Sequence, residues 1–91
     1  MRIALIAKDK PGSIEIRKAN RDAHVAYLKS TDPVEMAGPF LDEHGEMCGS
    51  LIVLELPDMA TAEAWAAKDP YKAADLFASV ELIAWNKVIG R

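Results

Sequence analysis

Hydrophobic and polar residues follow two different periods along the chain, and each period predicts its own secondary structure. Short runs of Ile, Leu and Val predict buried strands, whereas apolar positions three and four residues apart predict helices. Clusters of Gly, Pro, Asp and Ser separate these segments and indicate loops. In chain order, we predict a strand over 3–7, a helix that follows Ser13 and runs to about residue 29, strands over 34–41 and 47–56, a helix over 59–68, a short helix over 70–76 and a strand over 79–89.

Capping residues and a proline define the ends of these elements. Each helix follows a short polar side chain that can accept hydrogen bonds from the free N–H groups of a first turn, namely Ser13, Asp58 and Asp69. Pro39 interrupts strand 34–41. Because proline has no N–H to donate to a sheet, we expect this strand at an edge or at a bulge. The polar turn 42–46 then joins it to the next strand as an antiparallel hairpin.

The order of the elements, β-α-β-β-α-β, is typical of the ferredoxin-like fold. Right-handed crossovers place the two main helices on one face of a four-stranded antiparallel sheet. A chain of 91 residues is also short enough to form one domain. We therefore expect an α+β fold and a single domain over residues 1–91.

The expected strands are apolar on both faces, although the helices would cover only one. Val80, Leu82 and Ala84 alternate with Ile83 and Trp85 in the last strand. A large exposed apolar surface favours association, and a second copy of the chain would cover it. We therefore predict a homodimer through the open face of the sheet. The alternative, cover by loops or C-terminal residues, has few residues available to it.

Composition argues against several partners. The formal net charge is −3 and the basic residues are scattered, which argues against nucleic acid. No apolar run approaches the length of a membrane span, and the N-terminal run 3–7 is too short for a signal peptide. Cys48 is the single cysteine and cannot form an intramolecular disulfide, which fits a reducing compartment. We expect a cytoplasmic protein that binds neither nucleic acid nor membrane.

His24 is the strongest candidate for chemistry. The expected apolar face of the first helix consists of Ile16, Ala19, Ala23, Ala26 and Tyr27. His24 lies at the border of this face, where the core can orient an imidazole that still reaches a substrate and exchanges protons near neutral pH. Arg17 and Arg21 flank the same border, and these arginines could bind an anionic substrate. The alternative is a half-buried histidine with one structural hydrogen bond.

Asp69 is a natural partner for such a histidine. A carboxylate can fix the tautomer and orientation of an imidazole and stabilise the imidazolium. However, an aspartate before Pro70 at a helix start is also an ordinary cap. Spacing alone does not bring Asp69 near His24, so both interpretations stay open.

Asp42, His44 and Cys48 are residue types that can bind metals. Their spacing matches no zinc pattern, and the second half of a four-ligand set is missing. A polar hairpin turn accounts for Asp42 and His44, and a buried strand thiol accounts for Cys48. The sequence therefore predicts no metal site.

Five short segments spread over nearly the whole chain form a further pattern. They are Asp9-Lys10-Pro11-Gly12-Ser13, Arg21-Asp22-Ala23-His24-Val25-Ala26-Tyr27-Leu28, Ala37-Gly38-Pro39, Gly49-Ser50 and Asp69-Pro70-Tyr71. Their order and spacing resemble the YCII-related family. The resemblance implies a dimeric α+β barrel with a histidine–aspartate pair in a pocket. On that pattern His24 is the histidine and Asp69 is the acid.

The resemblance also implies the surroundings of this pair and the type of reaction. Gly38 and Pro39 would shape the pocket at a strand end, and Ser50 and Tyr71 would line it. We expect an enzyme of the lyase, isomerase or dehydrochlorinase type that acts on a small polar metabolite, aromatic or cyclic. His24 would be the general base or acid, Asp69 would orient it, and Arg21 would contact an anion.

This acid–base equipment requires no cofactor, and we expect none. The alternative function is a non-catalytic dimeric module that binds a small molecule or joins a larger assembly. A haem- or oxygen-dependent barrel enzyme is a third, weaker alternative.

Overall fold

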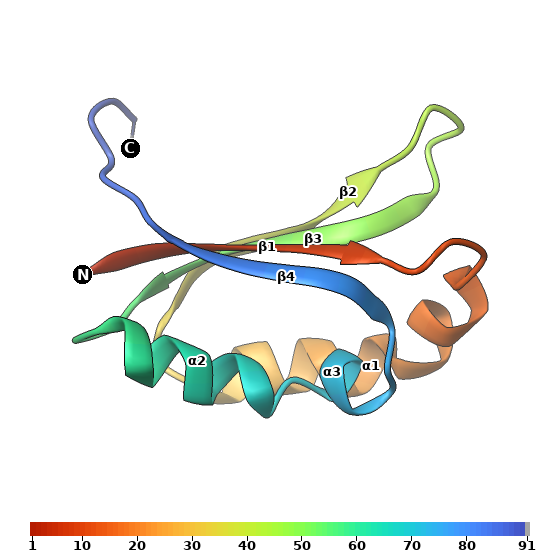
Figure 1. Cartoon of the computed structure of the whole chain (residues 1–91), viewed down its shortest axis with the longest axis horizontal. Helices are drawn as coiled ribbons and strands as arrows, with labels where there is room; N and C mark the ends of the chain where they lie inside the picture. The colour runs from red at the N-terminus through yellow and green to blue at the C-terminus, as the bar shows by residue number, and fades with distance from the viewer. Residues whose placement is uncertain (91) are drawn as a thin grey trace.

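The computed structural model describes residues 1–90 and contains the predicted order of elements (Figure 1). Its elements are β1 (Arg2–Asp9), α1 (Ile14–Ser30), β2 (Val34–Leu41), β3 (Met47–Glu55), α2 (Met59–Ala67), α3 (Pro70–Ala73) and β4 (Phe77–Ala84). The ferredoxin-like α+β prediction is therefore confirmed.

The four strands form one antiparallel sheet in the order β2-β3-β1-β4. The helices all lie on one face of this sheet (Figure 1). β2 and β3 form the expected hairpin, and β2 lies at an edge. This edge position accommodates Pro39, which has no N–H to offer a further strand.

The core lies between the sheet and the helices. Side chains alternate between the two faces of a strand, so Ile3, Leu5 and Ala7 of β1 all point toward the helices and are fully buried. Ile52 and Leu54 of β3 join the same cluster. From α2, Trp65 packs on this core, and its indole N–H donates to Thr31 Oγ1 at 3.0 Å.

The opposite face of the sheet has no covering element among the described residues. Ala4 of β1 pairs with Val53 and Ile83 across the neighbouring strands, which places all three on this open face. Ile83 is 44% exposed and Met36 is 50% exposed. Apolar side chains therefore line this face as predicted; Met36 and Ile83 are exposed on it, whereas the central Val53 is only 3% exposed.

The last strand is shorter than predicted. It ends at Ala84 rather than at residue 89. The cause lies in the neighbouring strand β1, where Ala84 pairs with Ile3 near the start of the strand. Beyond this pair, β1 offers only the carbonyl of Arg2, and this carbonyl accepts from the N–H of Trp85 at 3.0 Å. Residues 85–90 therefore leave the sheet on the side away from the helices (Figure 1).

The predicted buried face of α1 is wrong except at Tyr27, which is partly buried and packs against the core. Ile16 is 40% exposed, and Ala19, Ala23 and Ala26 are exposed as well. The face toward the sheet instead buries Arg17 and His24. Small alanines lose little when they face solvent, whereas the two basic side chains find buried partners, described below.

The helix starts also differ in part from the prediction. Ser13 occupies the N-cap position of α1, but its side chain makes no capping hydrogen bond. Asp58 caps α2 as expected, because its Oδ1 accepts from the N–H of Thr61 at 2.8 Å. Asp69 caps α3, which ends at Ala73 rather than at residue 76. None of the helices within residues 1–90 is both long and apolar enough to cross a bilayer.

Candidate functional site

His24 and Asp69 form a buried pair between α1 and α3. His24 Nδ1 lies 2.7 Å from Asp69 Oδ1, and the two residues are 6% and 2% exposed. An ionised carboxylate only accepts hydrogen bonds, so this contact assigns the proton to Nδ1. The other ring nitrogen, Nε2, is then left with a lone pair that can accept a proton.

One oxygen of Asp69 makes both of its hydrogen bonds. Oδ1 accepts from the backbone N–H of Tyr71 at 2.9 Å as well as from His24. Oδ2 is buried and has no hydrogen-bond partner among the described residues. Asp69 is therefore both the cap of α3 and the partner of the imidazole, two roles that the sequence left open.

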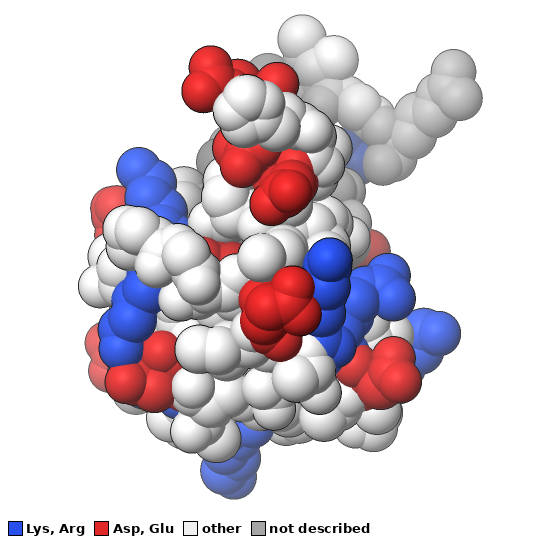
Figure 2. All heavy atoms as spheres, turned by 90° about the vertical axis from the view of Figure 1, so that its right-hand side faces the viewer, with Lys and Arg blue, Asp and Glu red and all other residues white. Residues whose placement is uncertain are grey.

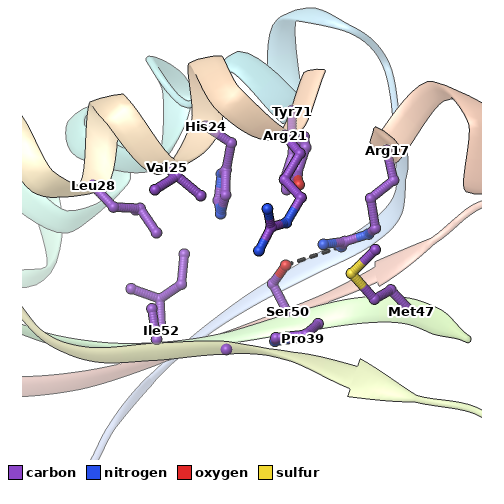
Figure 3. Close-up of a pocket in the computed structure, with 12 residues that line it drawn as sticks. Arg17, Arg21, His24, Val25, Leu28, Pro39, Met47, Ser50, Ile52 and Tyr71 are labelled. Carbon is purple, nitrogen blue, oxygen red and sulfur yellow. Dashed lines mark hydrogen bonds between the residues drawn. The ribbon is translucent and has the colours of Figure 1, made fainter. Parts of the chain in front are cut away.

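Tyr71 lies between His24 and Arg17 (Figure 3). Its ring stacks on the imidazole with centroids 3.8 Å apart and an interplanar angle of 15°. The Arg17 guanidinium carbon lies 4.6 Å from the centre of the Tyr71 ring. Burial raises the pKa of Tyr71, and the neighbouring Arg17 offsets only part of this rise. The phenol is therefore protonated at neutral pH.

Arg17 is anchored by a second buried ion pair. Its Nε and Nη2 donate to the two oxygens of Asp9 at 2.6 and 2.8 Å. Nη2 also donates to Ser50 Oγ at 2.9 Å. Burial opposes the charge on Arg17, but the hydrogen bonds and charge of Asp9 and the contact with Tyr71 outweigh it and raise the pKa of the guanidinium. Arg17 is thus a fixed cation in the wall of the site.

Sequence reasoning considered Arg17 only as a flanking cation for an anionic substrate and did not select Asp9. The available signal was the spacing, since Arg17 precedes His24 by seven residues and such positions share one helix face. Asp9 lies in one of the segments that carry the family resemblance. Neither signal showed that the two side chains would pair.

A cavity of about 160 Å³ lies between α1 and the β2–β3 edge of the sheet. Its walls combine basic and polar side chains with apolar ones (Figure 3). The lining residues are Arg17, Arg21, His24, Val25, Leu28, Ala37, Gly38, Pro39, Met47, Ser50, Ile52 and Tyr71. His24 and Arg21 point into this space from α1 (Figure 3).

The structure brings all the predicted site residues to this one place. Six of them line the cavity, namely Arg21, His24, Gly38, Pro39, Ser50 and Tyr71. Asp69 lies behind His24 and is not part of the lining. Arg21 is exposed at the rim and forms no hydrogen bond or salt bridge with any residue that the structure describes. Its guanidinium is therefore available to a ligand.

The turn residues considered for a metal site have structural partners. Asp42 Oδ1 accepts from the N–H groups of His44 and Glu46 at 2.8 and 3.0 Å, which closes the turn. Cys48 Sγ lies 3.6 Å from the carbonyl oxygen of Phe40. Over residues 1–90, no three His, Cys, Asp or Glu side chains are grouped to hold a metal ion.

Charges of both signs alternate on the face of the molecule that Figure 2 shows, which includes the β2–β3 turn. Acidic side chains gather over the β2–β3 turn, which contains Asp42, Glu43 and Glu46. Lys and Arg form no continuous basic surface on the face that Figure 2 shows.

Comparisons with known proteins identify the family. The sequence matches the YCII-related domain over residues 1–86. It is 32% identical to the protein YciI of Escherichia coli and 31% identical to a protein of Haemophilus influenzae, in each case over 97% of this chain and 99% of the relative.

A solved structure is similar over nearly the whole chain. It is 5-chloro-2-hydroxyhydroquinone dehydrochlorinase (TftG) from Burkholderia phenoliruptrix AC1100 in complex with 2,5-dihydroxybenzoquinone. The TM-score is 0.87 at 29% identity, over 94% of each chain. Together with the family match, this agreement leaves one conclusion: the chain belongs to the YCII-related domain family.

Proposed function

We propose that this protein is an acid–base enzyme of the lyase, isomerase or dehydrochlorinase type, acting on a small cyclic or aromatic metabolite that carries oxygen substituents. The observation that carries the proposal is the 2.7 Å contact between His24 and Asp69 beside a cavity. This arrangement leaves Nε2 of a buried, oriented imidazole facing the space where a ligand would lie.

In the proposed reaction, His24 Nε2 accepts a proton from the substrate. Asp69 stabilises the resulting imidazolium and holds the ring in place. The electron pair left on the substrate moves onto an oxygen or expels a leaving group such as chloride. Arg21 attracts the developing negative charge. These steps use only side chains of the chain itself.

The shape and polarity of the cavity support the substrate class. Val25, Leu28 and Ile52 supply apolar wall, while Arg21 and Ser50 supply polar groups. Such a mixture suits a flat ring with oxygen substituents. The similar dehydrochlorinase, which was solved with 2,5-dihydroxybenzoquinone, supports the same class.

Two assays test the proposal. The first measures chloride release from 5-chloro-2-hydroxyhydroquinone. The second follows, by proton NMR in D₂O, the exchange of carbon-bound hydrogens of 2,5-dihydroxybenzoquinone. We expect His24→Gln to lower the faster of the two rates by about 10²–10⁴-fold. His44→Gln is the matched control, because His44 is exposed in the β2–β3 turn and does not line the cavity.

The outcomes separate an enzyme from a binding module. Equal rates for wild type and His24→Gln would contradict the mechanism. Stoichiometric binding of either compound without any turnover would instead favour the non-catalytic module.

The proposal includes a homodimer formed through the open face of the sheet. Its support is the exposed apolar surface that includes Met36 and Ile83. We expect sedimentation equilibrium to give a dimer at micromolar concentration and Ile83→Glu to shift it toward monomer. A wild-type monomer under these conditions would contradict this part. The proposal also places the enzyme in the reducing cytoplasm, and the lone Cys48 supports that location.

A further inference from the structure

The direction of the hydrogen bond between Arg17 and the Ser50 hydroxyl is fixed. Arginine has five N–H donors and no acceptor. Because Arg17 Nη2 lies 2.9 Å from Ser50 Oγ, the serine oxygen must be the acceptor in this contact. The hydroxyl hydrogen then points away from Arg17. None of the hydrogen bonds among residues 1–90 uses that hydrogen.

The Ser50 hydroxyl cannot easily turn away from this arrangement, because Arg17 is held in place. Two hydrogen bonds join it to Asp9, its side chain is 2% exposed, and its guanidinium packs over Tyr71. Charged donors also form the stronger and shorter hydrogen bonds. Ser50 itself lies on β3 and is buried, so bulk water offers little competition.

The cavity is the open direction for the Ser50 hydrogen. Ser50 lines the cavity together with Arg21 and His24. Figure 3 shows its hydroxyl pointing from β3 into the space between Arg21 and Arg17, on the wall opposite α1. A ligand in this space would thus have a base on the helix side and a hydroxyl donor on the sheet side.

We propose that Ser50 is a catalytic hydrogen-bond donor to the ligand oxygen that gains negative charge, and that Arg17, held by Asp9, is the positioning residue that imposes this direction. The inference rests on the proposed function, since it concerns the same cavity and the same proton transfer. It adds a hydrogen-bond donor to the site, on the side of the cavity opposite His24.

The proton transfer balances with these groups alone. His24 Nε2 removes a proton from a carbon next to a carbonyl of the substrate. The C–H electron pair forms a carbon–carbon double bond, and the carbonyl π pair moves onto the oxygen. The resulting enolate oxygen accepts hydrogen bonds from Ser50 and from Arg21. In exchange or isomerisation, the enolate pair re-forms the carbonyl and carbon takes a proton back from the His24 imidazolium. In elimination, the enolate pair re-forms the carbonyl, and the carbon–carbon π pair forms a double bond to the carbon that carries chlorine. Chloride leaves with its bonding pair, and His24 releases its proton to water.

This arrangement also predicts which ligands the site prefers. Arg17 and Asp9 neutralise each other, so on the sheet side the ligand contacts a neutral donor that a charged neighbour polarises. A carbonyl, phenolate or enolate oxygen satisfies that donor. An amino group at the same point would place two donors against each other and bind poorly.

The test uses 2,5-dihydroxybenzoquinone as the probe. Exchange of its carbon-bound hydrogens passes through a keto tautomer in which that carbon lies next to carbonyl groups. We expect Ser50→Ala to lower kcat for exchange by about 10²–10³-fold, the usual effect of losing one such donor. Ser50→Thr keeps the hydroxyl and should restore most of the rate. Ser79→Ala, the same change at an exposed serine of β4, is the matched control.

An infrared measurement reads the hydrogen bond without relying on turnover. In wild type, the carbonyl stretch of bound probe should shift to lower frequency than in water-free solvent. Ser50→Ala should reduce this shift, because only Arg21 is then left to donate to the oxygen, whereas His24→Gln should keep the full shift. Arg17→Gln with Asp9→Asn removes both charges together, and we expect this pair of changes to weaken the shift while Ser50 is still present. Circular dichroism checks that each variant is folded.

The results distinguish failure of this inference from failure of the proposed function. A wild-type exchange rate and carbonyl shift in folded Ser50→Ala would overturn the inference, while loss of exchange in His24→Gln would still support the acid–base enzyme. If wild type shows a carbonyl shift that depends on Ser50 but no hydrogen exchange, Ser50 donates to the bound probe and catalysis on this probe is refuted. A full shift after both charges are removed would overturn the positioning role of Arg17. No binding of the probe by wild type would overturn the oxygen-ligand class and the inference with it.

Discussion

Asp69 holds His24 with the same carboxylate oxygen that caps helix α3. Oδ1 lies 2.7 Å from His24 Nδ1 and 2.9 Å from the backbone nitrogen of Tyr71. The orientation of the imidazole is therefore coupled to the start of the short helix that carries Tyr71. Since Tyr71 in turn stacks on the imidazole, one carboxylate positions two walls of the cavity.

Replacing Asp69 by Asn should separate its two roles. The amide oxygen can still cap α3, so we expect the free energy of unfolding to fall by about 1 kcal/mol or less. A neutral amide cannot stabilise the imidazolium, so the exchange rate should fall by about 10²–10⁴-fold. Asp69→Ala should also lose the cap, at a cost of about 0.5–2 kcal/mol. Urea unfolding and the NMR exchange assay check both values, and a wild-type rate in Asp69→Asn would contradict the pair's role.

Removing Arg17 alone should be strongly destabilising. Arg17→Met leaves the carboxylate of Asp9 buried without its cation, because the Arg17 and Asp9 side chains are only 2% and 6% exposed. We expect a loss of about 3–5 kcal/mol in the free energy of unfolding. Adding Asp9→Asn should recover part of this loss.

The exposed ion pair between Lys10 and Asp75 is the matched control for that experiment. Water already solvates both groups, so Lys10→Met should leave the urea midpoint nearly unchanged. Similar losses in Arg17→Met and Lys10→Met would show that burial does not decide the effect.

Tyr71 should make the protein sensitive to alkali. Burial raises the pKa of its phenol above the ordinary value of about 10. A raised pKa in the folded state means that the stability contribution is fully present below about pH 10 and is lost as pH rises through the folded-state pKa. Tyr71→Phe has no such proton to lose. Its urea midpoint should therefore decline less than that of wild type between about pH 9 and pH 11.

Tyr27 also contributes to the loss of stability in alkali, so a variant without either tyrosine is the control. Burial and the charge of Asp69 raise the pKa of Tyr27 too, and its hydroxyl donates to the carbonyl of Trp65 at 2.7 Å. The chain has two tyrosines, so changing both to Phe removes all phenol titration. An alkaline decline in Tyr71→Phe as steep as in wild type would contradict the assignment to Tyr71.

Gly49 should not tolerate a side chain. A Cβ at this position would meet the backbone carbonyl oxygen of Ala7 on the neighbouring strand. Backbone in the centre of a sheet cannot move aside cheaply, so we expect Gly49→Ala to lower the free energy of unfolding by about 1–3 kcal/mol. Gly38→Ala is the control on the edge strand, where nothing lies within 4 Å of the added Cβ. Equal urea midpoints for the two variants would contradict this reasoning.

Local sequence determined the element types and their order. Apolar periodicity, Pro39 and the caps Asp58 and Asp69 act within a few residues of where they stand, so their effects can be inferred without the fold. The edge position of the hairpin strand followed in the same way. The segments that resemble the family supplied the candidate residues, and the structure places them around one cavity.

Only the tertiary structure decided which face of α1 is buried and where β4 ends. Periodicity favoured the alanine-rich face, but Arg17 and His24 are buried because Asp9 and Asp69 reach them from other elements. β4 stops at Ala84 because its neighbour β1 runs out of partners. Such effects depend on groups that are distant in sequence, and a buried charge becomes favourable only when the fold supplies its partner.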